Sequence, residues 1–339
     1  MAVTAACLLL GQAPAQADTI PEIVAKTKPA VDANVYYNGL TALDKRDYEK
    51  AIRDFTEAIR LGPNNVLAYK NRGLAYFSAK DYDKAISDYS EAIRLDPNYT
   101  TAYIDRGLAY DEVKDYDRAI SDYNNAIRLD PNYAPAYLNR GDGYFVTNNY
   151  DAAIRDFTEA IRLDPDYDRA YFYRGNVYSH QGNLDSAIKD FTEAIRLDPN
   201  HARAHWSRGN AYYDKKDYEK AITDFDEAIR LDGKFAAAYV ERGDAYDKRG
   251  DFDHAISDYN NAIRVDPKFA FAYYNRGCAY YDHADYDAAM AETSLLEQLL
   301  EKMPPEQKAS LIAFSAGSFW DRAHALRRLF AMRDDWHST

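Results

Sequence analysis

Small and apolar residues recur along most of the chain with one fixed period. A glycine occurs every 34 residues from Gly39 to Gly277, and an alanine follows each of them 12 positions later. When units are numbered from Asp32, small or aromatic residues occupy positions 4, 8, 11, 20, 24 and 27, and proline usually occupies position 32. Spacings of three and four residues place each triplet on one face of an α-helix. Each unit is therefore predicted to contain two amphipathic helices, helix A at about positions 2–14 and helix B at about 16–30.

The residues between these positions predict how the helices begin, end and pair. Position 16 is Asp or Asn in all eight units, which is typical of the N-cap of a helix. Proline at position 32 ends helix B, and we expect Gly233, which replaces it in the sixth unit, to loosen that joint without shifting the register. Position 7 is Arg in seven units and position 23 is acidic in all eight, so the pattern predicts an ion pair between helices A and B. Glycine at position 8 and alanine at position 20 predict close packing of the two helices.

This pattern resembles the tetratricopeptide repeat family over residues 32 to about 300. The sequence departs from the family at position 4, where Val35 and His205 replace a large aromatic residue, and at the arginines of position 7. The resemblance implies an all-α fold, a right-handed α-solenoid of about eight 34-residue helix–turn–helix units with a C-terminal helical cap. The expected units are residues 32–65, 66–99, 100–133, 134–167, 168–201, 202–235, 236–269 and 270–303.

Residues 1–17 combine an apolar run with the small-residue site Ala15-Gln16-Ala17. This predicts a secretory signal peptide cleaved after Ala17, although no Lys or Arg precedes the run. The alternatives are a disordered or packed N-terminal segment, or a lipoprotein signal at Cys7. We expect an exported, periplasmic protein, or a cytoplasmic one if the segment is not a signal peptide. The apolar run is too short to span a membrane.

The two remaining segments flank the repeats. Residues 18–31 are expected to lead into the array, and residues 304–339 to form capping helices over its last unit. The alternative for this tail is self-association, with Trp320 and Trp336 as anchors.

Charge and motifs argue against several classes of function. The net charge of −13 disfavours binding to nucleic acids and to anionic lipids. No phosphate-binding or nucleophile motif occurs, and His201 and His205 lack the glutamate of a zinc-protease motif, so we assign them structural roles. The sequence therefore predicts no enzyme, no cofactor and no metal.

The resemblance implies that helix A lines a concave groove, with positions 2, 5, 6, 9, 12 and 13 facing it. These positions vary between units while the packing positions repeat. This contrast favours a groove whose chemistry changes from one unit to the next and suits a particular partner. The lysine–asparagine clamp for chaperone tails is absent, because Leu74 follows Lys70. The predicted partner-binding residues are Ile104, Asp111, Leu138, Asp142, Phe145, Phe172, Asn176, Trp206, Asn210, Tyr213, Asp244 and Asp247.

Apolar and aromatic residues with an acidic rim predict the ligand class. We expect a scaffold that binds a protein or peptide segment carrying apolar anchors and some Lys or Arg. Three alternatives remain open at this point. The chain's own N-terminal segment or tail could fill the groove, the aromatics could stack on carbohydrate of a cell wall, or the tail could mediate homotypic assembly.

Overall fold

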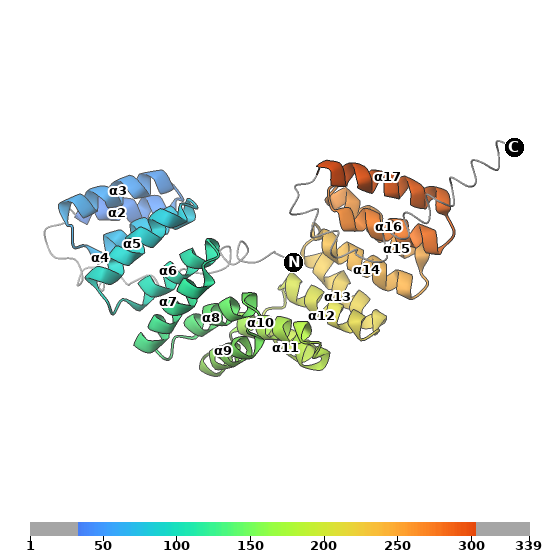
Figure 1. Cartoon of the computed structure of the whole chain (residues 1–339), viewed down its shortest axis with the longest axis horizontal. Helices are drawn as coiled ribbons and strands as arrows, with labels where there is room; N and C mark the ends of the chain where they lie inside the picture. Colours follow the sequence, from blue (N-terminus) through green and yellow to red (C-terminus); the bar gives the residue numbers. More distant parts are fainter. Residues whose placement is uncertain (1–32, 303–339) are drawn as a thin grey trace. The chain divides into compact units, whose positions relative to one another are not determined.

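The computed structural model describes residues 33–302, which form helices joined by short turns (Figure 1). Helices A and B alternate along this part of the chain, and no strand occurs within it. The predicted all-α repeat fold is confirmed. The predicted signal peptide, the lead-in and the C-terminal tail lie outside the described residues.

Contacts divide the chain into two compact units on either side of the bond between Val177 and Tyr178, which we call the N-terminal and C-terminal units. The N-terminal unit contains α2 (Ala33–Asp44), α3 (Tyr48–Leu61), α4 (Val66–Ser78), α5 (Tyr82–Leu95), α6 (Thr100–Glu112), α7 (Tyr116–Leu129), α8 (Ala134–Val146), α9 (Tyr150–Leu163) and most of α10 (Asp168–His180). The C-terminal unit contains α11 (Leu184–Leu197), α12 (Ala202–Asp214), α13 (Tyr218–Leu231), α14 (Ala236–Lys248), α15 (Phe252–Val265), α16 (Ala270–Asp282) and α17 (Tyr286–Lys302).

The residue at position 16 begins helix B as the sequence predicts. Its side chain accepts a hydrogen bond from the backbone N–H three residues later in seven units, whereas Asn149 makes no such bond. The preceding residue is left-handed in every unit, with a φ between 60° and 80°, which the sequence analysis did not predict. Glycine relieves the steric cost of this conformation only at Gly182 and Gly250. In the sixth unit the register survives Gly233, because Asp232 N–H still donates to the Ala228 carbonyl at 2.9 Å and ends α13 at Leu231.

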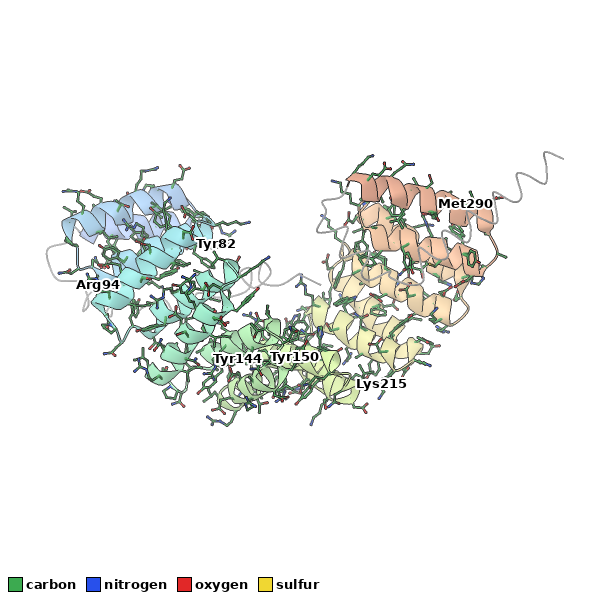
Figure 2. All side chains as sticks on the ribbon, in the orientation of Figure 1. Tyr82, Arg94, Tyr144, Tyr150, Lys215 and Met290 are labelled. Atoms are coloured by element: carbon green, nitrogen blue, oxygen red, sulfur yellow. The ribbon has the colours of Figure 1, made fainter. Side chains whose placement is uncertain are left out.

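In six repeats an aromatic ring fills the space that the glycine at position 8 leaves open, whereas a Cβ atom at Gly277 would lie 3.2 Å from Cβ of Glu292. A Cβ atom at Gly141 would lie 2.7 Å from Cε1 of Phe157, and one at Gly209 would lie 2.7 Å from Cε1 of Phe225. Both rings are fully buried between helix A and helix B of their own unit. Tyr144 and Tyr150 (Figure 2) pack around the same cluster as Phe157. The sequence thus predicted the close packing, and the structure shows that a ring from position 24 makes the contact.

The predicted pair between positions 7 and 23 forms, and the same arginine also reaches the preceding repeat. The Nε and Nη2 atoms of Arg106 donate to the two carboxylate oxygens of Asp122, both at 2.7 Å. Its Nη1 donates to Ser90 Oγ at 3.0 Å, on helix B of the preceding repeat. A two-bond pair of this kind is geometrically specific and holds helices A and B in register. Equivalent two-bond pairs join Arg72 to Asp88, Arg140 to Asp156, Arg208 to Asp224 and Arg242 to Asp258.

We expect Gly141→Ala to lower the free energy of unfolding by about 1–3 kcal/mol, because its methyl group would overlap the Phe157 ring. This loss outweighs the higher helix propensity of alanine, which is worth about 1 kcal/mol. Gly233→Ala is the matched control, since its nearest neighbour would be the Ile229 carbonyl oxygen at 4.0 Å. Urea unfolding followed by circular dichroism measures both, and equal stabilities of the two variants would contradict the steric argument.

Candidate functional site

The residues predicted to bind a partner all lie on helix A of their repeat. Those in the N-terminal unit are Ile104 and Asp111 on α6, Leu138, Asp142 and Phe145 on α8, and Phe172 and Asn176 on α10. Those in the C-terminal unit are Trp206, Asn210 and Tyr213 on α12, and Asp244 and Asp247 on α14. We describe the two sets separately.

The apolar residues of the N-terminal set differ in depth. Ile104 is 2% exposed and Leu138 is 1% exposed, so both contribute mainly to the packing between helices. Phe145 is half-buried, and so is Phe172, whose ring packs edge-on against Tyr173 with the centroids 5.5 Å apart. The two phenylalanines are therefore the members of this set that offer apolar surface.

Two carboxyl groups of the N-terminal unit lie close enough to affect each other. Asp111 Oδ2 accepts a hydrogen bond from the Tyr123 hydroxyl at 2.5 Å, while Asp111 Oδ1 is buried without a hydrogen-bond partner among the described residues. Burial raises the pKa of Asp111 to about 7, the Tyr123 hydrogen bond opposes this, and the neighbouring Asp142 and Glu112 add to it. Burial likewise raises the pKa of Asp142 to about 6, and Arg169 opposes the shift. This group is the N-terminal acidic cluster.

The C-terminal unit holds a second such group on α14. Burial raises the pKa of Glu241, and the negative charges of Asp244 and Asp214 raise it further. Burial also raises the pKa of Asp244, although Asp244 accepts hydrogen bonds from the Tyr259 hydroxyl at 2.7 Å and from Asn275. Neither carboxyl group has an arginine partner among the contacts of the described residues. We call these residues the C-terminal acidic cluster.

Aromatic side chains accompany the C-terminal acidic cluster. Trp206 packs on Phe235 with the ring centroids 5.5 Å apart, and Tyr213 packs edge-on against Tyr218 at 5.4 Å. The indole Nε1 of Trp206 is buried, with no hydrogen-bond partner in the described part of the chain. Asp244 and Asp247 raise the pKa of Tyr213 beyond the effect of burial, which places this ring beside the carboxylates.

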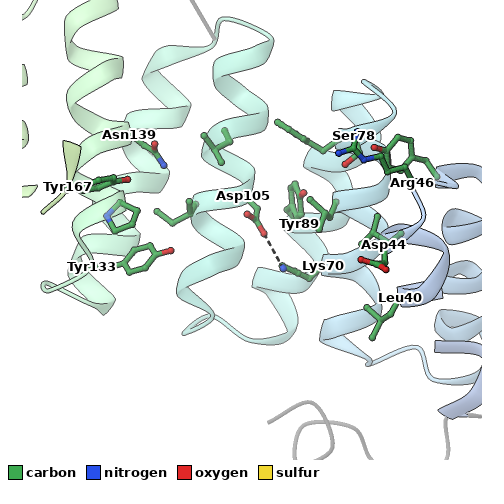
Figure 3. A pocket seen from close by; sticks show the side chains of 17 residues that line it. Leu40, Asp44, Arg46, Lys70, Ser78, Tyr89, Asp105, Tyr133, Asn139 and Tyr167 are labelled. Atoms are coloured by element: carbon green, nitrogen blue, oxygen red, sulfur yellow. Dashed lines mark ion pairs between the residues drawn. The ribbon is translucent and has the colours of Figure 1, made fainter. Parts of the chain in front are cut away.

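A cavity of about 520 Å³ lies within the N-terminal unit. Residues of α2, α4, α6 and α8 line it, and its apolar wall includes Leu74, Phe77, Ile104 and Leu108. Figure 3 shows Lys70 and Asp105 facing each other across this space, with Lys70 Nζ 3.8 Å from Asp105 Oδ2. At that distance the two charges attract, but they are too far apart for a hydrogen bond.

Sequence reasoning did not select the residues that give this cavity its polarity. Lys70 was named only for the absent chaperone clamp, and Asp105 occupies position 6, a groove-facing position at which no binding residue was predicted. The sequence does contain a sign of Asp105. It is an acidic residue at a groove-facing position with apolar or aromatic neighbours, which is unusual on a solvated helix face. Ile104 belongs both to the predicted set and to the cavity wall.

No helix among residues 33–302 has the length and hydropathy needed to cross a lipid bilayer.

Comparison with known proteins agrees with the repeat pattern. Sequence models described as tetratricopeptide repeat or TPR repeat match residues 37–100, 101–133, 138–200, 181–234 and 243–283. A search of curated proteins finds no match.

Several solved structures share the fold. A tetratricopeptide repeat protein from Parabacteroides merdae has a TM-score of 0.58 and 20% identity, over 73% of this chain and 98% of that chain. Yeast Tom70 has a TM-score of 0.54 and 25% identity, over 92% of this chain and 67% of that chain. Pseudomonas aeruginosa pilF has a TM-score of 0.55 and 20% identity, over 61% of this chain and 94% of that chain.

The raised pKa of Asp111 predicts how stability depends on pH. The folded state holds this proton more tightly than the unfolded state, so its contribution is present below the unfolded pKa and is lost as the pH rises through about 7. We expect the free energy of unfolding to fall by about 1–3 kcal/mol more in the wild type than in Asp111→Asn between about pH 5 and pH 8. Asn keeps an oxygen for Tyr123, and thermal unfolding across this range measures the difference.

The matched control for Asp111→Asn is Asp117→Asn, at an exposed position on α7. It removes the same charge and should leave the pH dependence of the wild type unchanged. Parallel curves for the wild type and Asp111→Asn would show that Asp111 ionises normally.

Proposed function

Because the chain belongs to the tetratricopeptide repeat family and is a protein–protein interaction scaffold, we propose that it is non-enzymatic and binds a partner segment on the surface formed by helices A. The segment carries Lys or Arg among apolar residues. The observation that carries this proposal is that Asp111 in the N-terminal unit and Asp244 in the C-terminal unit are held by tyrosine hydroxyls and not by arginine. Burial raises the pKa values of both carboxyl groups.

These two carboxyl groups differ from the carboxylates that hold the repeats together. Asp122 is paired with Arg106 through two hydrogen bonds, so its charge is compensated within the fold. Asp111 and Asp244 are hydrogen-bonded by tyrosine hydroxyls, which supply no positive charge. A Lys or Arg side chain brought by a partner would supply that charge and lower both pKa values. The fold thus supports a basic ligand at two separate places.

Half-buried aromatics on helices A support apolar anchors in the same ligand. Phe172 lies on α10 and Trp206 lies on α12, each on helix A of its repeat. Large aromatics with one polar atom are typical anchors of protein interfaces.

Two peptides with identical apolar residues, one carrying lysines and the other glutamates, test this proposal by fluorescence anisotropy with the full chain. We expect the lysine peptide to bind at least about tenfold more tightly, and Asp244→Asn to weaken it by about three- to thirtyfold. The affinity should rise from about pH 5.5 to pH 8, because carboxyl groups with raised pKa values ionise over that range.

The control for Asp244→Asn is Asp253→Asn, an exposed position on α15 that removes the same charge. The proposal fails if both peptides bind equally, or if the control weakens the lysine peptide as much as Asp244→Asn does. Affinity capture with the wild type and these two variants then identifies the natural partner.

We also propose that the protein is exported, an inference that rests on residues 2–17 of the sequence alone. N-terminal sequencing of the protein purified from its source cells should begin at Asp18. A sequence that begins upstream of Ala17 would contradict cleavage at this site.

A further inference from the structure

Tyr89 is a tyrosine whose hydroxyl has no hydrogen-bond partner among the described residues, although the side chain is 0% exposed. Two other repeats have tyrosine at the same position, and each hydroxyl donates a hydrogen bond to an aspartate on helix A of its own repeat. Tyr123 donates to Asp111 and Tyr259 donates to Asp244. In the unit of Tyr89 the corresponding positions are occupied by Leu74 and Phe77, which cannot accept a hydrogen bond.

The packing of the helices does not require this hydroxyl. Phenylalanine occupies the same repeat position at residues 55, 157, 191 and 225 and is fully buried at each of them. The rings of Phe55 and Phe157 fill the space beside their glycines as the ring of Tyr89 fills the space beside Gly73, with the same separation of 2.7 Å. A buried hydroxyl without a partner destabilises a fold relative to phenylalanine. The contacts among residues 33–302 therefore give the hydroxyl of Tyr89 no structural benefit.

The hydroxyl belongs to a residue that lines the cavity of the N-terminal unit, together with Lys70 and Asp105 (Figure 3). Asp105 Oδ2 is also buried without a hydrogen-bond partner in the described chain, and the side chains of Lys70 and Asp105 are only 12% and 14% exposed. The negative charge of Asp105 raises the pKa of Tyr89 in addition to burial, which places the two groups near each other. One cavity thus contains a cation, an acceptor and a hydroxyl, with the last two unsatisfied.

The charges of this group restrict what it can bind. Lys70 and Asp105 together carry no net charge, so Asp105 repels an added carboxylate and Lys70 repels an added ammonium. A planar amide is uncharged and presents one N–H donor and one carbonyl acceptor. Its N–H can donate to Asp105, and its carbonyl can accept from Lys70 or Tyr89.

We propose that this cavity binds a peptide segment through an uncharged amide held by Lys70, Asp105 and the Tyr89 hydroxyl, with an apolar side chain against Leu74, Phe77 and Ile104. The volume of about 520 Å³ lies within the range of small-ligand sites, about 300–1,000 Å³. The inference rests on the proposed function, because it assigns a peptide to the helix A surface, and it adds the chemical group that is recognised there.

Three tripeptides test the inference with the full chain: N-acetyl-Ala-Leu-Ala amide, the same peptide with a free carboxylate, and the same peptide with a free amino terminus. Calorimetric or NMR titration measures each affinity. We expect the blocked, uncharged peptide to bind at least about fivefold more tightly than either charged one. Tyr89→Phe should weaken it by about three- to tenfold, the usual effect of one hydrogen bond, without lowering the Tm.

Variants that change one charge of the cavity distinguish recognition of the uncharged amide from a change in the shape of the cavity. Asp105→Asn keeps the side-chain size and leaves Lys70 uncompensated, so the preference should shift toward the carboxylate peptide. Lys70→Gln should shift it toward the peptide with the free amine. Tyr123→Phe is the matched control for Tyr89→Phe, since it removes a hydroxyl that donates to Asp111 elsewhere in the same unit, and it should leave the affinity unchanged.

Equal binding of the three tripeptides, no saturable binding at millimolar concentration, or an unchanged affinity in Tyr89→Phe would each overturn the inference. These outcomes are distinguishable from failure of the proposed function. If the lysine-bearing peptide still binds and Asp244→Asn weakens its binding, the proposed function is supported and only the inference about the cavity is rejected. If the uncharged tripeptide binds while the lysine and glutamate peptides bind equally, the cavity assignment stands and the basic ligand is lost.

Discussion

The close approach of helix A and helix B at one glycine is the constraint on which six of the described repeats depend. With no Cβ at position 8, the ring at position 24 lies against the backbone of helix A, and even a methyl group would come within 2.8 Å of that ring in six units. This contact fixes the separation of the two helices, so the residues one position earlier on each helix are also brought together. Arg106 can then reach Asp122 with two bonds, because the spacing is already set. In these repeats the steric contact and the ion pair therefore act at adjacent positions of the same two helices.

The arginine at position 7 explains how one repeat is joined to the next. Its Nε and Nη2 atoms hold helix B of its own repeat, and its Nη1 atom reaches a polar side chain on the preceding helix B, such as Ser90 or Asn124. The last described repeat shows how much geometry matters, because Glu292 replaces Asp and Arg276 donates only one bond to it. These contacts do not involve positions 5, 6, 9 and 12 of helix A. The residues at those positions differ from one repeat to the next, and they range from buried, as at Ile104 and Leu138, to half-buried, as at Phe145 and Phe172.

Periodicity predicted the packing and capping residues because each of them makes the same local contact in successive repeats. The caps, the pairing of Arg106 with Asp122 and the small residue at position 8 were all visible in this way. The burial of the groove-facing side chains was not predictable, since it depends on which side chains the neighbouring helices A place beside them. Ile104 and Leu138 occupy predicted groove positions but are buried by their neighbours, whereas the polar groups of Lys70 and Asp105 lie in a cavity. The left-handed backbone conformation two residues before each helix B was not predicted either. The sequence gives no sign of it at Lys80 and Lys114, where lysine stands in place of the glycine that usually marks this conformation.

The same residue type has two roles in this chain, and the partner of each carboxylate distinguishes them. An aspartate at position 23 faces arginine and is a neutralised part of the frame. Asp111 and Asp244, at positions 12 and 9, instead accept hydrogen bonds from tyrosine hydroxyls, and burial raises their pKa values, although Lys248 opposes the shift at Asp244. Below a pH of about 6 to 7 such a group holds a proton that a cationic side chain would displace, so that in this range ligand binding and proton release are linked. The basic partner that we propose would compensate the electrostatic cost of these buried carboxyl groups, which the hydrogen bonds from tyrosine leave in place.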